Sequence, residues 1–197
     1  MRNYILFIVV QVHDMSKLGA CLIIFMLSLI LAGTCLAEGM SLYAMGIRYG
    51  TNDGTDKKTD LKRYEVFGVL NLPWSWPLAS NIDLDTRLVT SAGMLDGEGD
   101  SGFIGTLGPG ICLTDKNKRF TLELSGGVAL LPDYRMGDED FGGPVQFTFD
   151  LGIGVRLFKH FNLGYRIQHF SDAALWGSDN RGVDMQLFEL GYRFPSH

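Results

Sequence analysis

The chain has little cysteine and proline, and it has no cluster of basic residues. Its 197 residues include three cysteines and six prolines, and 17 lysines and arginines stand against 22 acidic residues, for a net charge of -5. A nucleic-acid-binding protein normally carries clustered positive charge, so no nucleic-acid partner is expected. Zinc-ligand spacings, phosphate-binding loops and Gly-rich nucleotide fingerprints are also missing. The sequence therefore predicts neither a metal nor a cofactor.

The N-terminal segment has the features of a secretory signal peptide. Residues 20–31 form an apolar run, ACLIIFMLSLIL, which follows the charged Lys17. Residues 35–37, Cys-Leu-Ala, fit the small-x-small rule for signal peptidase. We therefore expect cleavage after Ala37, with residues 1–37 as the signal peptide and residues 38–197 as a single mature domain.

Three other interpretations of this segment stay open. Met15 is a plausible true start, because the residues after it supply a charged region. A retained membrane helix is disfavoured by the shortness of the apolar run, and a lipoprotein signal at Cys35 is disfavoured by the preceding Thr34. Cleavage would remove Cys21 and Cys35, and since only Cys112 would remain, no intramolecular disulfide is expected.

The mature region is rich in glycine and in alternating apolar residues. Glycine contributes 25 residues and aromatics 12%, which suits many strands and turns. Apolar residues at every second position predict eight strands: 42–50, 61–72, 82–90, 103–113, 120–131, 145–157, a seventh that contains 165–171 and an eighth that contains 184–194. In the first strand, Tyr43, Met45, Ile47 and Tyr49 are predicted to share a face.

The segments between the predicted strands alternate between longer polar loops and shorter turns. Residues 51–60, 91–100 and 132–143 are predicted loops, whereas residues 73–81 are a predicted short connection in which Trp74 and Trp76 suit a membrane interface. An even strand number with this alternation predicts an all-β, eight-stranded, antiparallel up-and-down transmembrane β-barrel with both termini on the short-turn side.

A soluble eight-stranded barrel is the alternative architecture. Such a barrel turns its apolar face inward and exposes a charged face. Here every lysine of the mature region lies in a predicted loop or at a strand end, which favours the membrane barrel. The inward face then holds Gly, Thr, Gln, Asp and Arg, and Glu189 is expected there beside Arg166 or Arg193.

Three polar residues lie at one end of the apolar face of the last two strands. His169 and Ser171 share the parity of Ile167, and Asp184 shares the parity of Phe188 on the following strand. A serine hydroxyl needs a neighbouring base to become nucleophilic, and the base needs a carboxylate to hold its tautomer. Residues on facing strands can meet in this way. The pattern indicates a Ser/His/acid site on the lipid-facing rim, although the same residues could merely mark the strand ends.

The residues 169–173, His-Phe-Ser-Asp-Ala, and 180–184, Asn-Arg-Gly-Val-Asp, resemble the lipid A 3-O-deacylase family. The family pattern is H-x-S-N-A followed by N-x-G-x-E, on an eight-stranded barrel of the bacterial outer membrane. The resemblance implies hydrolysis of the ester-linked acyl chain at position 3 of lipid A, with lipopolysaccharide and outer-membrane lipid as partners. It leaves open whether the barrel forms a homodimer.

The resemblance also implies a role for each matching residue. His169 would be the general base, Ser171 the nucleophile, and Asp184 would take the place of the family's Glu. Asp172 stands where the family has the Asn that helps to stabilise the oxyanion. Because an ionised carboxylate cannot donate a hydrogen bond, the oxyanion hole would rely on backbone N–H groups near Ala173 and Ala174.

The sequence also allows other roles for its acidic residues and another function for the barrel. Asp172 or Asp179 could supply the acid of the triad, but each is poorer in parity or in loop placement. The acidic residues 138–140 could attract divalent cations, although a solvated loop is the more common outcome. A non-enzymatic barrel with a structural or surface-binding role is the second functional hypothesis.

Overall fold

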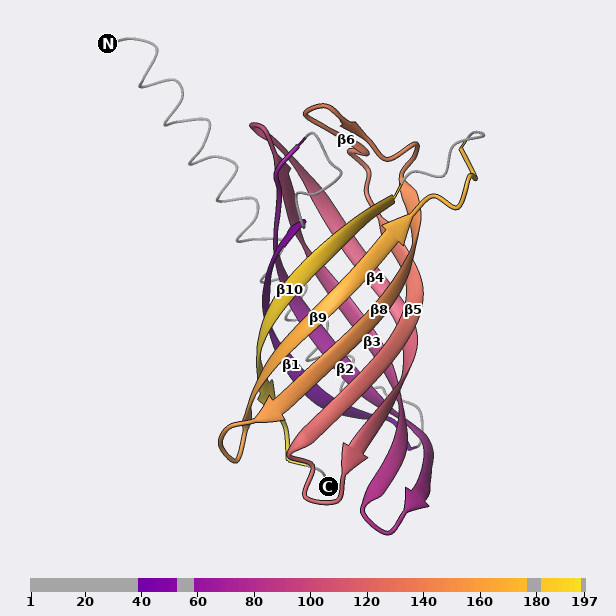
Figure 1. Ribbon diagram of the computed structural model, residues 1–197, viewed down its shortest axis with the longest axis vertical. Coiled ribbons are helices and arrows are strands. Elements are labelled where there is room, and N and C mark those ends of the chain that lie inside the picture. The colour runs from indigo at the N-terminus through magenta and orange to yellow at the C-terminus, as the bar shows by residue number, and fades with distance from the viewer. Residues whose placement is uncertain (1–38, 53–58, 177–181, 196–197) are drawn as a thin grey trace, which may run out of the picture. The chain divides into compact units, whose positions relative to one another are not determined.

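Eight long strands of the computed structural model close into an antiparallel barrel (Figure 1). The structure describes residues 39–52, 59–176 and 182–195. The barrel strands follow the order β1-β10-β9-β8-β5-β4-β3-β2, and β6 and β7 form a separate hairpin. The bounds are β1 Ser41–Asn52, β2 Leu61–Ala79, β3 Ile82–Gly97, β4 Asp100–Asp115, β5 Phe120–Leu130, β6 Arg135–Met136, β7 Glu139–Asp140, β8 Val145–Arg156, β9 Phe161–Ser171 and β10 Gly182–Arg193.

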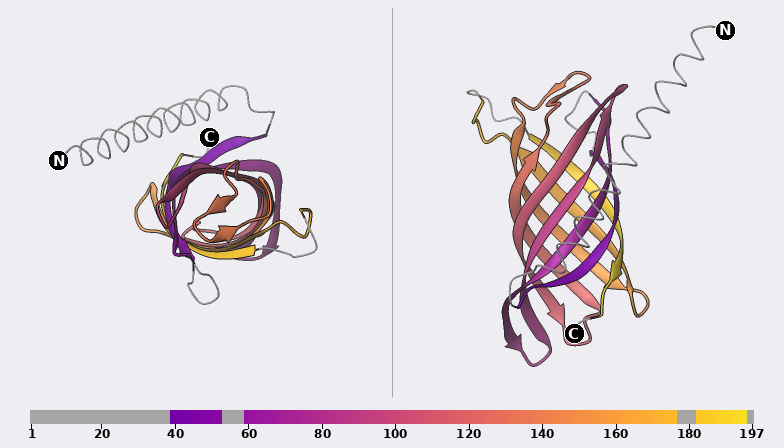
Figure 2. Two further views of the ribbon diagram at one scale, coloured as in Figure 1. Left: turned by 90° about the horizontal axis from the view of Figure 1, so that it is seen from above. Right: turned by 180° about the vertical axis from the view of Figure 1, so that it is seen from behind.

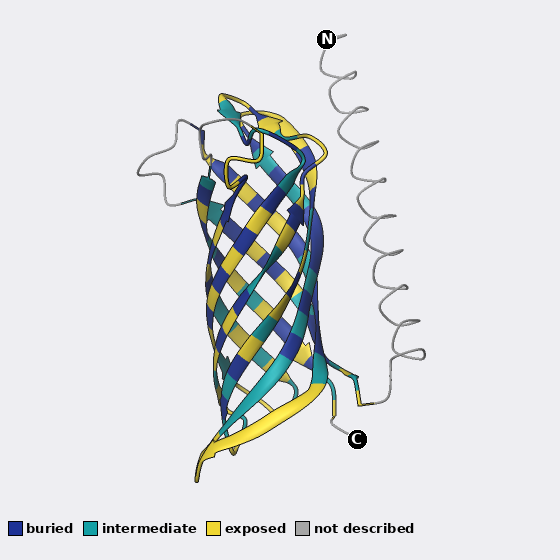
Figure 3. Ribbon diagram, turned by 90° about the vertical axis from the view of Figure 1, so that its right-hand side faces the viewer, coloured by how far each residue is buried: buried dark blue, intermediate teal, exposed yellow. Residues whose placement is uncertain are grey.

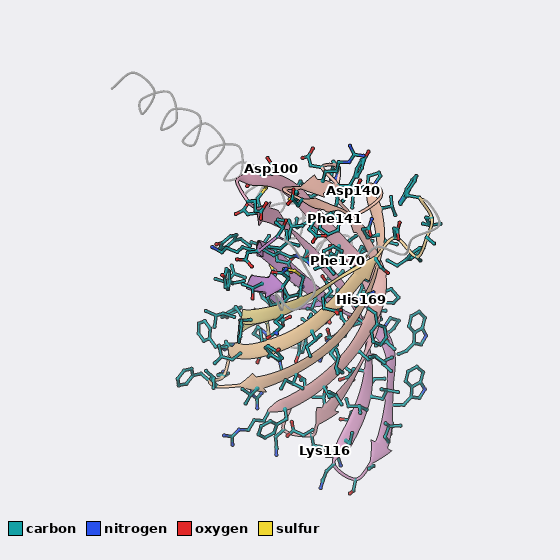
Figure 4. All side chains as sticks on the ribbon, turned by 45° about the horizontal axis from the view of Figure 1, so that its top comes forward. Asp100, Lys116, Asp140, Phe141, His169 and Phe170 are labelled. Carbon is teal, nitrogen blue, oxygen red and sulfur yellow. The ribbon has the colours of Figure 1, made fainter. Side chains whose placement is uncertain are left out.

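The eight-stranded barrel confirms the fold predicted from the alternation. Within the described ranges no helix has the length and apolar character needed to cross a membrane. The predicted signal peptide, residues 1–37, lies outside the described residues. We call the end of the barrel that carries the β6–β7 hairpin the loop end, and the end that carries Lys116 the turn end (Figure 4).

Exposed and buried residues alternate along the barrel strands (Figure 3). On β8, Phe147 and Phe149 are exposed, whereas Thr148 and Asp150 are buried in the interior. The exposed side chains on the barrel wall are mainly Leu, Ile, Val, Phe and Tyr. This is the reverse of a soluble barrel and is the pattern expected of a wall that faces lipid.

Strands β2 and β3 extend furthest beyond their predicted ends. β2 continues through Ala79, so that Trp74 and Trp76 lie in a strand and not in a connection. β1 begins opposite Asn71 of β2, so the rest of β2 has a free edge on that side, where proline is tolerated. β3 continues to Gly97, and the predicted loop 91–100 shrinks to a tight turn in which Glu98 and Gly99 have φ of 49° and 95°.

The predicted face of Tyr43 was wrong. The register of β1 against β2 shifts between Leu42 and Ala44, which marks a β-bulge at Tyr43. Its ring lies in the interior, with the guanidinium carbons of Arg87 and Arg193 at 4.1 and 4.8 Å from the ring centroid. The bulge therefore moves one aromatic residue from the lipid face to the lumen at the turn end.

Buried ion pairs fill the middle of the lumen. Glu65 contacts Arg63 and Arg48, and Glu189 lies 2.7 Å from both Arg48 and Arg166. Arg166 also reaches Glu123 at 2.5 Å. The predicted pairing of Glu189 with Arg166 is confirmed, whereas Arg193 instead donates to the Lys118 carbonyl. Each interior charge in this network has an opposite charge beside it, which offsets the free-energy cost of its burial.

An apolar cluster closes the lumen at the loop end. Seen along the barrel axis, the β6–β7 hairpin lies across the opening (Figure 2). Met136 and Phe141 come from this hairpin segment and pack with Phe170, whose ring centroid lies 5.5 Å from that of Phe141. Gln146 donates to the carbonyls of Phe141 and Gly143 and so holds the segment in place. The lumen is therefore closed at the loop end, and an outward-facing site is reached from the membrane side.

Candidate active site

His169 and Asp184 form a hydrogen-bonded pair on the outer wall near the loop end. They are paired residues of β9 and β10, and His169 Nδ1 lies 2.7 Å from Asp184 Oδ1. The side chains are 47% and 58% exposed, so both face outward as the parity predicted. Figure 4 shows His169 close to Phe170, whose own side chain points inward and is buried.

Ser171 lies beside the opposite edge of the imidazole. It is paired with Gly182 of β10, the residue two positions before Asp184. A Cβ on Gly182 would lie 3.1 Å from His169 Nε2 and 3.0 Å from Ser171 Cβ. The imidazole thus turns Nδ1 towards Asp184, and its Cε1–Nε2 edge and Ser171 both border Gly182.

The serine does not yet contact the base. Ser171 is buried, and among the described residues no hydrogen bond joins its hydroxyl to His169. Catalytic hydrogen bonds in the absence of substrate are often long and tighten only when substrate binds.

A left-handed turn follows Ser171. Ala173 and Ala174 have φ of 48° and 60°, and the Leu175 N–H donates to the Asp172 carbonyl at 2.9 Å. Two successive positive φ values make this a type I′ turn, which non-glycine residues rarely adopt because of the clash at Cβ. Backbone strain of this kind collects at functional sites.

The carboxylate of Asp172 is part of this turn. It is buried, and its Oδ1 accepts the Ala174 N–H at 3.1 Å. One of the two backbone donors expected near an oxyanion is therefore already occupied. The Ala173 N–H is the donor left for that role.

Asp179 and the acidic residues 138–140 were the other acidic candidates predicted from the sequence. Asp179 lies outside the described residues. Asp140, from the acidic loop, pairs with Arg135 and accepts the Gly142 N–H. No group of three or more possible metal ligands occurs within the part of the chain that the structure describes.

Sequence reasoning missed the contributions of two residues near the site. The sequence indicated Gly182 only as a member of the motif at residues 180–184. The register that sets Asp184 opposite His169 also sets Gly182 opposite Ser171. Its position could have been found by counting two residues back from Asp184. Trp176 carried no periodic signal, because it lies in the loop after β9 and its contacts are with the start of β8.

The closed barrel with its apolar outer wall and closed loop end is an outer-membrane barrel. The outward-facing His169 and Asp184, with Ser171 nearby, form a candidate hydrolytic site on its lipid-facing surface. A family model described as Lipid A 3-O-deacylase (PagL) matches residues 63–193. The chain belongs to this lipid A 3-O-deacylase family.

Two further comparisons agree with that membership. The lipid A deacylase PagL of Pseudomonas aeruginosa is 27% identical over 141 residues, which are 64% of this chain and 76% of that protein. The crystal structure of the outer membrane enzyme PagL superimposes with a TM-score of 0.64 and 20% identity, and the match covers 78% of this chain and 99% of the other. The second comparison supports the barrel fold.

Proposed function

We propose that this chain is an outer-membrane esterase that hydrolyses the ester-linked acyl chain at position 3 of lipid A. The reaction is the one that the family description names. The observation that carries the proposal for this chain is the outward imidazole of His169, which contacts Asp184 on one side and lies beside Ser171 on the other. The three residues are proposed as base, acid and nucleophile.

In the first step His169 acts as general base. The Nδ1–H group donates a hydrogen bond to Asp184, and the Nε2 lone pair is left free to accept the proton of the Ser171 hydroxyl. As Ser171 Oγ attacks the ester carbonyl carbon, its proton passes to Nε2. The tetrahedral intermediate then collapses, the bond to the sugar oxygen breaks, and His169 returns the proton to that oxygen. Asp184 stabilises the transient imidazolium.

In the second step water takes the place of the serine. His169 removes a proton from the water, the hydroxide attacks the acyl-serine carbonyl, and the proton returns to Ser171 Oγ as the fatty acid leaves. Both steps place negative charge on the carbonyl oxygen. The Ala173 N–H is proposed as its hydrogen-bond donor, while an ionised Asp172 next to it opposes that charge and slows the reaction.

The position of the site suits a substrate that stays in the membrane. We propose that the loop end faces the cell exterior, which puts His169 and Ser171 at the depth of the outer leaflet. Exposed apolar residues such as Phe149 and Ile167 surround the site on the wall. Lipid A could therefore approach from the side with its acyl chains still in hydrocarbon.

The test is a Ser171→Ala substitution in a chain expressed in an outer membrane, with lipid A examined by mass spectrometry. Wild type is expected to remove one acyl chain from lipid A, and the variant none. Ser101→Ala is the control, because Ser101 is another serine at the loop end, exposed and bonded to Asp96, away from His169. Identical lipid A from wild type and Ser171→Ala would leave the non-enzymatic barrel as the better account.

We also propose that residues 1–37 are removed on export. The intact mass of protein purified from outer membranes should then correspond to a chain that begins at Glu38. A mass that includes the apolar run 20–31 would contradict cleavage after Ala37.

A further inference from the structure

Trp176 is held in place beside the candidate site by two contacts. Its indole Nε1–H donates to the Val145 carbonyl at 3.2 Å. Its ring also lies against Gly143, where an added Cβ would come within 2.5 Å of three ring atoms. Even so, 47% of Trp176 is exposed. The loop after β9 thus presents a fixed, half-exposed indole over the start of β8.

The strand register locates this indole relative to Ser171. Ser171 is paired with Phe147 of β8, and Val145 lies two residues nearer the loop end. A strand rises about 3.3 Å per residue and neighbouring strands are about 5 Å apart. The backbone anchor of Trp176 is therefore roughly 7 Å above Ser171 along the strand direction, on the adjacent strand. A single sugar ring fits in such an interval.

The chemistry of the substrate determines which part of lipid A would lie between Ser171 and Trp176. If the ester carbonyl is at Ser171, the acyl chain has to run towards the apolar middle of the wall, past residues such as Phe149 and Leu151. The sugar that carries the ester then lies on the other side of Ser171, at the loop end. An indole offers a flat apolar face and is suited to this boundary between hydrocarbon and water.

We propose that Trp176 forms a sugar subsite, in which its indole packs against the glucosamine ring that carries the scissile ester. This inference rests on the proposed function. Gly143 belongs to the subsite because only a residue without a side chain leaves room for the ring at this position. Trp176 does not touch the reacting atoms, and its contribution is to binding.

The kinetic test compares variants in detergent micelles with lipid A as substrate. Trp176→Ala is expected to raise KM about tenfold with kcat nearly unchanged, since one aromatic contact contributes about that much to affinity. Trp176→Phe should recover part of the loss, and Gly143→Ala should reproduce it by displacing the ring. Trp76→Ala, at the turn end, is the matched control and should have wild-type KM. A Trp176→Ala enzyme with unchanged KM would overturn the subsite.

A binding test works without hydrolysis. The chain has three tryptophans, so Trp74→Phe and Trp76→Phe in a Ser171→Ala background leave Trp176 as the only indole. Its fluorescence should shift when lipid A is added but not when phosphatidylcholine is added. Equal shifts with both lipids would mean that Trp176 is only an interfacial anchor. If the wild-type chain proves unable to hydrolyse lipid A but the Ser171→Ala chain still gives a shift specific to lipid A, the proposed function is refuted and the subsite is supported.

Discussion

Strands β9 and β10 carry two acid–base pairs that face opposite sides of the same wall. Arg166 and Glu189 face the lumen, and His169 and Asp184 face outward, each pair with a closest contact of 2.7 Å. The inner side chains are 5% and 15% exposed, against 47% and 58% for the outer ones. The contact distance is the same in the two pairs, so only the exposure of their side chains distinguishes them.

The inner pair has little bonding capacity left for a ligand. Glu189 also accepts from Arg48, and Arg166 also reaches Glu123 and Ser125. The outer pair leaves the imidazole Nε2 without a hydrogen-bond partner among the described residues and is open to its surroundings, and Ser171 lies nearby across Gly182. A buried network of paired charges holds the barrel together, whereas an exposed pair adds at most about 1 kcal/mol to stability and is free to do chemistry.

The largest expected effect separates the two pairs by activity. His169→Ala should lower the rate of acyl-chain release about a thousandfold or more, because the general base is lost. The urea midpoint for unfolding in lipid vesicles should stay near that of wild type, since the pair is exposed. Fatty-acid release measures the expected loss of activity, and the unfolding midpoint tests whether stability is retained. Activity within tenfold of wild type would remove His169 from the mechanism.

The inner pair should show the opposite response. Glu189→Ala leaves Arg48 and Arg166 without a shared carboxylate in the lumen, which should destabilise the barrel by about 3–5 kcal/mol. The rate per folded molecule should change little. Urea unfolding in vesicles measures the first quantity. A loss of stability below about 1 kcal/mol would show that the lumen tolerates the loss of the carboxylate shared by Arg48 and Arg166, and the inner pair would then not be needed for stability.

A third change sharpens the outer site. Asp172→Asn keeps an oxygen for the Ala174 N–H and replaces the opposing charge with an amide donor. The rate should rise about tenfold or more, because an added oxyanion donor can contribute at least that much. Asp172→Ala is the control: it removes the charge and also the bond that holds the turn, so it should not reproduce the gain. An Asn variant no faster than wild type would show that Asp172 does not face the developing charge.

The smallest effects come from a matched pair of glycines. Gly182→Ala would press on His169 and Ser171, and Gly164→Ala would place a Cβ 2.9 Å from Glu189 Oε2. The first should lower activity about tenfold without a change in stability. The second should destabilise by about 1–2 kcal/mol with activity retained. If both variants changed the same property, the division between an outer and an inner function would fail.

The barrel could be predicted because its wall preserves a simple period. Residues 145–155 alternate apolar and polar side chains, and β8 follows that alternation residue by residue. Parity also predicted His169, Ser171 and Asp184 on the outward face, and His169 and Asp184 are exposed there, whereas Ser171 is buried. Parity needs only the strand geometry and no knowledge of partners, which is why this part of the site could be found from the sequence.

The errors arose where closure of the barrel overrides local signals. Pro73 and Pro77 look like strand breakers, but β1 does not extend beside them and the register of β2 against β3 shifts around both, and proline is tolerated at such edges and bulges. Gly93 looks like a loop residue, but a Cβ at that position would lie 2.0 Å from the Tyr64 carbonyl oxygen, so the close approach of β2 to β3 requires glycine. Neither the β-bulge at Tyr43 nor the indole of Trp176 over Gly143 leaves a local pattern, because each depends on residues distant in sequence.

The most direct measurement is covalent labelling of the purified barrel with a fluorophosphonate, which reacts with an activated serine. The account predicts that peptide mass mapping finds the label on Ser171 in wild type, and that His169→Ala and Asp184→Ala lose most of it. Label absent from Ser171 in a folded barrel, or equal labelling in wild type and His169→Ala, would contradict the claim that the outward His169 activates this hydroxyl.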